Sequence, residues 1–99
     1  MALAVYDVAR IDALLAALDA GVDISALDAA LARLVPDVAR RHCDAGDVLE
    51  EPFRSHAGFD LHLLDTSGHC LRVTGDPGEA GALLIARKAS ETAQAEMAR

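Results

Sequence analysis

The chain has 99 residues, of which 53% are hydrophobic and 25% charged, and its formal net charge at pH 7 is −7. This length allows one compact domain. We expect residues 1–99 to form it, with frayed ends at 1–6 and at about 92–99. The hydrophobic fraction excludes a disordered tail. The acidic excess, with no basic stripe to balance it, argues against nucleic-acid binding.

The composition also bears on the compartment. The two cysteines, Cys43 and Cys70, are too few for a disulfide scaffold. No uncharged run approaches the roughly 18–20 residues that a membrane-spanning helix needs. The segment Met1–Asp7 lacks the basic start of a signal peptide. We therefore expect a cytoplasmic protein with free thiols and no membrane contact.

The spacing of apolar residues predicts two helices in the first third of the chain. One stripe of a helix over residues 7–20 is formed by Ile11, Leu14, Leu15 and Leu18. Asp7 is a candidate N-cap for this helix. A second helix is expected to begin at Ser25 and to end before Pro36, because a residue that precedes proline avoids helical angles. The two helices would form a helical hairpin.

The next segment, Val38–Cys43, fits either a helix or a short edge strand, and Asp44–Pro52 reads as an acidic loop. The strongest strand pattern is Phe59–Thr74, which begins with alternating apolar and polar residues. A turn at Thr66–Gly68 would pair Leu63 with Leu71 and Leu61 with Val73. We expect this hairpin at about residues 58–74.

The last predicted element is a helix that begins after Asp76. Asp76 is a suitable N-cap, Pro77 suits the first helical position, and Glu79 suits a capping box. An apolar run over residues 83–86 follows. The sequence thus predicts an α+β fold: an N-terminal helical hairpin, a small antiparallel sheet of two to three strands, and a C-terminal helix.

Part of the chain resembles a family of short uncharacterised proteobacterial proteins associated with nitrogen-fixation gene clusters. The resemblance covers roughly residues 25–90, and its specific segments are Gly58–Asp65, Gly68–Leu71 and Thr74–Pro77. It implies that Val38–Cys43 is a strand, and it implies a setting in nitrogen fixation. It supplies no catalytic residues.

Two His-Cys pairs suggest a metal site. The candidate ligands are His42, Cys43, His69 and Cys70, because imidazole and thiolate are preferred ligands of zinc and other transition metals. If 38–43 is a strand beside the hairpin, the two pairs could converge. The alternative is that the thiols are simply buried. A zinc or iron cofactor is therefore the alternative to a protein without a cofactor.

The expected hairpin register also predicts a polar surface. It places His62 opposite Arg72 with Asp60 nearby, as a docking surface or a small anion site. Ser55, His56 and Asp60 lie close in sequence, but no strained nucleophile turn accompanies them. The sequence therefore identifies no catalytic residue and favours a non-enzymatic accessory or protein-binding module. A homodimer is expected, because the apolar helices exceed what a small sheet can cover, and a further protein partner is compatible with it.

Overall fold

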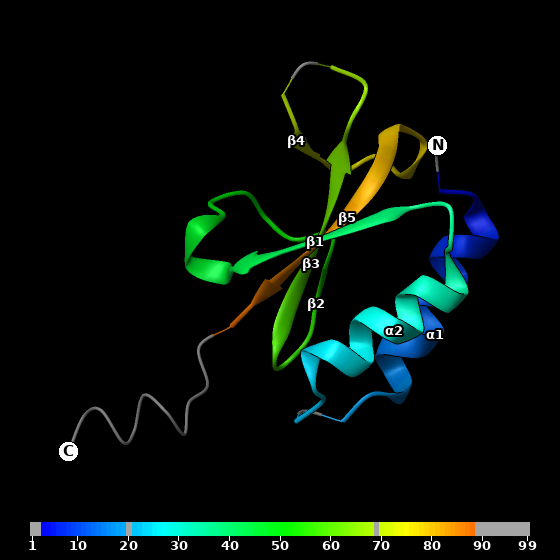
Figure 1. Cartoon of the computed structure of the whole chain (residues 1–99), viewed down its shortest axis with the longest axis vertical. Helices are drawn as coiled ribbons and strands as arrows, with labels where there is room; N and C mark the ends of the chain where they lie inside the picture. Colours follow the sequence, from blue (N-terminus) through cyan, green and yellow to red (C-terminus); the bar gives the residue numbers. More distant parts are fainter. Residues whose placement is uncertain (1–2, 20, 69, 89–99) are drawn as a thin grey trace.

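In the computed structural model, the described residues are 3–19, 21–68 and 70–88. In these ranges two helices precede a mixed five-stranded sheet (Figure 1). The helices are α1 (Val5–Ala17) and α2 (Ile24–Leu34). The strands are β1 (Ala39–Asp44), β2 (Arg54–Ser55), β3 (Phe59–Asp65), β4 (Arg72–Thr74) and β5 (Ala80–Arg87). Two 3-10 turns, η1 (Ala45–Asp47) and η2 (Pro77–Glu79), precede β2 and β5.

The sheet is built around β5, which lies between β1 and β3. The order is β1-β5-β3-β2, with β1 parallel and β3 antiparallel to β5. The other edge of β3 is shared by β2, which pairs with its first half, and β4, which pairs with its end. Strand β1 therefore forms one edge of the sheet, and two short strands form the other.

The predicted C-terminal helix is wrong, because Ala80–Arg87 forms strand β5. Strand β5 is buried on both faces, so it reads as a continuous apolar run that also suits a helix. The predicted cap at Asp76 does form: its carboxylate accepts from the Gly78 N–H at 2.8 Å. It starts only one 3-10 turn. A mixed five-stranded sheet thus replaces the predicted small antiparallel sheet with its covering C-terminal helix.

The ambiguous segment near residue 40 is a strand, as the resemblance implied. It was expected beside the hairpin, but β1 pairs with β5 and with neither strand of the hairpin. This wrong pairing follows from the wrong C-terminal helix. Because residues 80–87 were predicted to be helical, they were not considered as a strand that could pair with β1.

The hairpin forms, but its predicted register is wrong. Leu63 pairs with Thr74, Leu64 with Val73, and Asp65 with Arg72. This is three positions away from the expected register, and an odd shift moves side chains to the other face of the sheet. Leu71, expected in the core, is 43% exposed.

One face of the sheet is covered by α1 and α2, and the turn η1 lies away from these helices, beyond the end of β1 (Figure 1). The core fills the space under the helices. Its largest fully buried side chains are Ile11, Leu27, Leu31, Phe59, Leu61, Leu63, Leu83 and Ile85. Neither helix is long and apolar enough to cross a membrane, among the residues that the structure describes.

The helix boundaries differ slightly from the predicted ones. Helix α1 begins at Val5, and Asp7 stabilises its start from the third helical position, where its carboxylate accepts from the Ala4 N–H at 3.0 Å. Helix α2 begins at Ile24 and ends at Leu34, two residues before Pro36, as expected from the proline.

Gly81 provides a stability test of the β5 placement. A Cβ at this position would collide with the Thr66 hydroxyl and lie 3.2 Å from the Thr66 Cβ, whereas a Cβ at Gly46 meets nothing within 4 Å. We expect Gly81→Ala to lower the free energy of unfolding by about 1–3 kcal/mol through overpacking. The control, Gly46→Ala, should change it by no more than about 0.5 kcal/mol. Urea titration measures both, and equal stability of the two variants would contradict the close contact between Gly81 and the Thr66 side chain.

Candidate functional site

Three of the four predicted metal ligands, His42, Cys43 and Cys70, lie in the described residues, and the structure does not gather them into one cluster. His42 and Cys43 are neighbours on β1, so their side chains lie on opposite faces of the sheet. Cys70 is exposed in the loop before β4, and His69 lies outside the described residues. No group of three or more His, Cys, Asp or Glu side chains suited to a metal ion occurs in the ranges that the structure covers.

Cys43 is held as a neutral thiol. Its partial burial raises the pKa of the thiol, and the nearby carboxylates of Asp47 and Asp44 raise it further. Since the thiolate is the form that attacks electrophiles and binds metals, these surroundings lower the reactivity of Cys43 at neutral pH.

The predicted polar surface of Asp60, His62 and Arg72 is separated into three environments. His62 is only 2% exposed, and its buried Nδ1 has no hydrogen-bond partner. Arg72 instead donates to Asp65 at 3.0 Å, because the register places these two residues opposite each other. Asp60 belongs to a cluster at the other end of β3.

That cluster joins Asp60 to Ser55 and Lys88. The Ser55 hydroxyl donates to Asp60 at 2.7 Å, and the Lys88 ammonium donates to the Ser55 hydroxyl at 3.0 Å and to the His56 carbonyl at 2.6 Å. Lys88 also lies 3.3 Å from Asp60. Nothing in the sequence indicated Lys88, which is more than thirty positions from Ser55.

The His56 ring is turned away from Ser55. The His56 ring stacks on Phe59 with a centroid distance of 4.9 Å, and its Nε2 lies 3.3 Å from the Leu18 carbonyl oxygen. His56 therefore cannot serve as a base for Ser55 in this arrangement. Lys88 donates to its neighbours and so acts as a clip between β2 and the end of β5.

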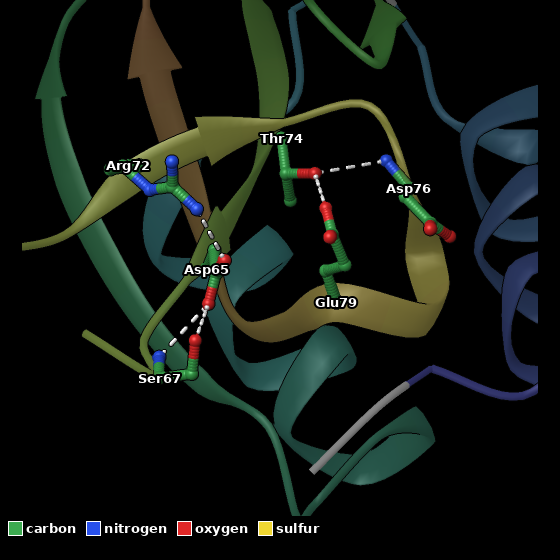
Figure 2. A network of polar contacts seen from close by, with 6 residues as sticks. All are labelled: Asp65, Ser67, Arg72, Thr74, Asp76 and Glu79. Carbon is green, nitrogen blue, oxygen red and sulfur yellow. Dashed lines mark hydrogen bonds and ion pairs between the residues drawn. The ribbon is translucent and has the colours of Figure 1, made fainter.

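A second polar network lies at the opposite end of β3 (Figure 2). Asp65 accepts from the Ser67 hydroxyl at 2.6 Å, from the Ser67 N–H at 2.9 Å and from Arg72. Nearby, Thr74 donates to Glu79 at 2.7 Å and accepts from the Asp76 N–H at 3.2 Å. These bonds tie the loop after β3 and the turn η2 to strand β4.

A shallow pocket of about 530 Å³ lies by β2 and β4. Its lining comes from two segments, residues 50–54 and 73–75. The cationic residue of this lining, Arg54, already bonds Asp12 of α1 at 2.6 and 3.1 Å and stacks on Phe53. The remaining charged residues are Glu50 and Glu51, so the pocket has no free cation to balance them.

The outer edge of β1 is the feature that the rest of the fold leaves open. Over the described chain, β1 pairs with β5 alone. The side chains of Arg40 and His42 turn toward α2, where both lie close to Asp28, at 3.0 and 2.9 Å. The hydrogen bond from His42, followed by that from Arg40, lowers the pKa of the Asp28 carboxyl. These contacts fix two side chains and leave the main chain of β1 accessible at the edge.

The pairing of β5 shows which peptide groups of β1 point outward. Lys88 donates its N–H to the Gly58 carbonyl at 3.1 Å, so the even-numbered residues of β5 direct their peptide groups to β3 and the odd-numbered ones to β1. Arg40 lies opposite Leu83 in the parallel pair. A residue in a parallel pair bonds to the two residues that flank its partner. The outward peptide groups of β1 are therefore those of Arg40, His42 and Asp44.

Comparison of the chain with models of protein families, with curated proteins and with solved structures found no match. The resemblance to the family linked to nitrogen fixation stays an expectation from the residues alone.

The Asp65 network predicts an acid-dependent loss of stability. Its hydrogen bonds, first those from Ser67 and then that from Arg72, lower the pKa of Asp65 from 3.8 to about 2. A carboxyl whose pKa is lower in the folded chain stabilises the fold above its ordinary pKa, and this stabilisation is lost as the pH falls from about 4 toward 2. We expect Asp65→Asn to be less stable at pH 7 and to show a smaller decrease in this window.

The matched variant is Ser67→Ala, which removes the hydroxyl donor and keeps the backbone N–H. Its effect should be intermediate between those of the wild type and Asp65→Asn. Urea midpoints at a series of pH values measure all three proteins. Identical pH profiles of the wild type and Asp65→Asn would contradict the assigned role of Asp65.

Proposed function

We propose that this protein is a non-enzymatic protein-binding module that receives an extended segment of its partner at the outer edge of β1. The observation that carries the proposal is the row of outward peptide groups along β1. A strand added to such an edge gains main-chain hydrogen bonds at every second residue, which is a recurring mode of peptide recognition.

The lengths of the two sheet edges favour β1. This strand has six residues, whereas β2 and β4 on the opposite edge have two and three. At about 3.3 Å per residue, β1 offers an edge of about 20 Å. The opposite edge is divided between two separate strands, so it cannot hold one continuous added strand of this length.

The charged side chains of β1 affect which partner can pair with this edge, but they do not block its outward peptide groups. Charged side chains commonly protect an edge strand from nonspecific pairing. Here the Arg40 guanidinium and the His42 ring are drawn to Asp28 on one face of the sheet. Arg41 stays exposed. The edge therefore selects a partner that places compatible side chains opposite Arg40, Arg41 and Asp44.

The cellular setting belongs to the proposal as well. We place the module in the cytoplasm, in agreement with the free thiols of Cys43 and Cys70. A role beside the nitrogen-fixation machinery follows from the resemblance alone.

The test compares two substitutions at one residue. His42→Pro removes an outward N–H that no residue of the sheet uses, and proline is tolerated at such positions of edge strands. His42→Ala removes the same side chain but keeps this N–H. Both variants lose the contact with Asp28, so any difference in binding reports the main-chain donor.

We expect His42→Ala to retain most of the partner binding and His42→Pro to lose at least about tenfold in affinity, the equivalent of about 1.4 kcal/mol. Affinity capture from cells of the native host, followed by cross-linking to residues 39–44, identifies the partner and its position. Circular dichroism checks that both variants are folded. A partner bound equally well by both variants would exclude the edge of β1 as the binding element.

A further inference from the structure

We infer that the segment received at this edge is the β1 strand of a second copy of the chain, paired antiparallel with His42 opposite His42 of that copy. This inference rests on the proposed function, which it deepens by naming the partner. It follows from three constraints: the pleat of β1, its outward peptide groups and the order of its charges.

The pleat restricts the registers that a symmetric pair can adopt. Residues directly opposite in an antiparallel pair have side chains on the same face of the sheet. In β1 the even-numbered side chains face the helices, as Arg40 and His42 show by contacting Asp28 of α2, and the odd-numbered ones face the other side. The two-fold axis must therefore pass beside one residue, and the central candidates are Arg41, His42 and Cys43.

The charges distinguish these three registers. Centring on Arg41 places this guanidinium against its own copy, and like charges directly opposite destabilise a strand pair. Centring on Cys43 leaves only residues 42–44 of each β1 in the ladder. Centring on His42 keeps residues 40–44 of both strands and places each Arg40 opposite the other copy's Asp44. Two pairs of opposite charges then flank the axis, one on each side.

The peptide groups agree with this register. Arg40, His42 and Asp44 are the residues whose N–H and C=O groups point outward, and these same residues lie opposite one another when His42 is central. They would form the hydrogen-bonded pairs of the new ladder. Arg41 would then lie opposite Cys43 of the second copy as a non-hydrogen-bonded pair, in which the Cα atoms are closest, about 4.5 Å apart.

The helix beside the edge carries small side chains next to Asp28. Asp28 of helix α2 contacts β1, and the exposed neighbouring positions Ser25 and Ala29 are small. Small residues let two helices on the same face of a joined sheet approach closely. The two helical layers and the two sheets would continue across the axis.

Engineered cysteines read the register directly. In a Cys70→Ser background, Arg41→Cys should form a disulfide with the native Cys43 of the second copy under mild oxidation, because their Cα distance suits a disulfide. The first control, Cys70→Ser alone, should form none, since the two Cys43 residues would be two positions out of line. The second control adds Cys43→Ser to the Arg41→Cys protein and should also form none.

Each register gives its own pattern, mapped by mass spectrometry of the linked peptides. A link between the two Cys43 residues in the first control would show the register centred on Cys43. A link in the second control would show the register centred on Arg41. Either result overturns the proposed register, and so does the absence of the expected link in a folded protein.

Light scattering on the unmodified protein tests the self-association itself. We expect a dimer at micromolar concentration, a monomer for His42→Pro, and a dimer about tenfold weaker for Asp44→Arg, which places like charges opposite each other. A strict monomer, or a dimer that His42→Pro leaves intact, overturns the inference. If the protein is a strict monomer, the proposed function still stands provided that a different protein binds His42→Ala but not His42→Pro. It fails if no binding is weakened by His42→Pro.

Discussion

The position of β5 between β1 and β3 is the constraint on which the rest of the structure depends. Its side chains Leu83 and Ile85 lie in the core under the helices, fully buried with Leu61 and Leu63 of the neighbouring strand. Strand β5 is the last element of the described chain, yet it lies between β1 and β3, which precede it in sequence. Without β5, strand β1 would lose its partner in the sheet, and β3 would lose the longest of its pairings.

This insertion decides which side of β1 stays open. Because β5 occupies the inner side of β1, only the outer side of β1 remains, and the parallel register fixes which peptide groups point away. The other edge of the sheet is divided between two short strands, β2 and β4. The candidate binding edge is thus a consequence of topology and not of one unusual residue.

Each helix is tied to one edge strand by a carboxylate. Asp12 of α1 bonds Arg54 of β2, and Asp28 of α2 bonds Arg40 and His42 of β1. These groups are partly exposed, so each pair contributes at most about 1 kcal/mol. Their effect is chiefly geometric: they orient the two helices over the sheet and hold the charged side chains of β1 away from the outward peptide groups.

The sequence was informative where apolar and polar residues recur with a clear period and misleading where both faces of an element are apolar. The period of Ile11, Leu14, Leu15 and Leu18 predicted α1, and the alternation from Phe59 predicted β3. Strand β5 was mistaken for a helix because it is apolar on both faces and follows a genuine cap at Asp76.

The candidate site was harder to predict, because it follows from pairing between distant segments. The register of the hairpin depends on a loop longer than the predicted turn, so Arg72 lies opposite Asp65 and not opposite His62. The contacts of Asp28 and Lys88 cross long stretches of sequence that carry no local signal. The open edge of β1 could be recognised only after β5 was placed.

The most direct test of this account is amide hydrogen exchange along β1, resolved residue by residue by mass spectrometry at nanomolar concentration, where a dimer dissociates, and again at high micromolar concentration. The account predicts alternating protection in the dilute protein: the amides of Arg41 and Cys43 exchange slowly, and those of Arg40, His42 and Asp44 exchange fast. At high concentration the fast amides should become protected while the rest of the sheet is unchanged. Uniform protection along β1 in dilute solution, or fast exchange of all its amides, would contradict the placement of β1 at an open edge.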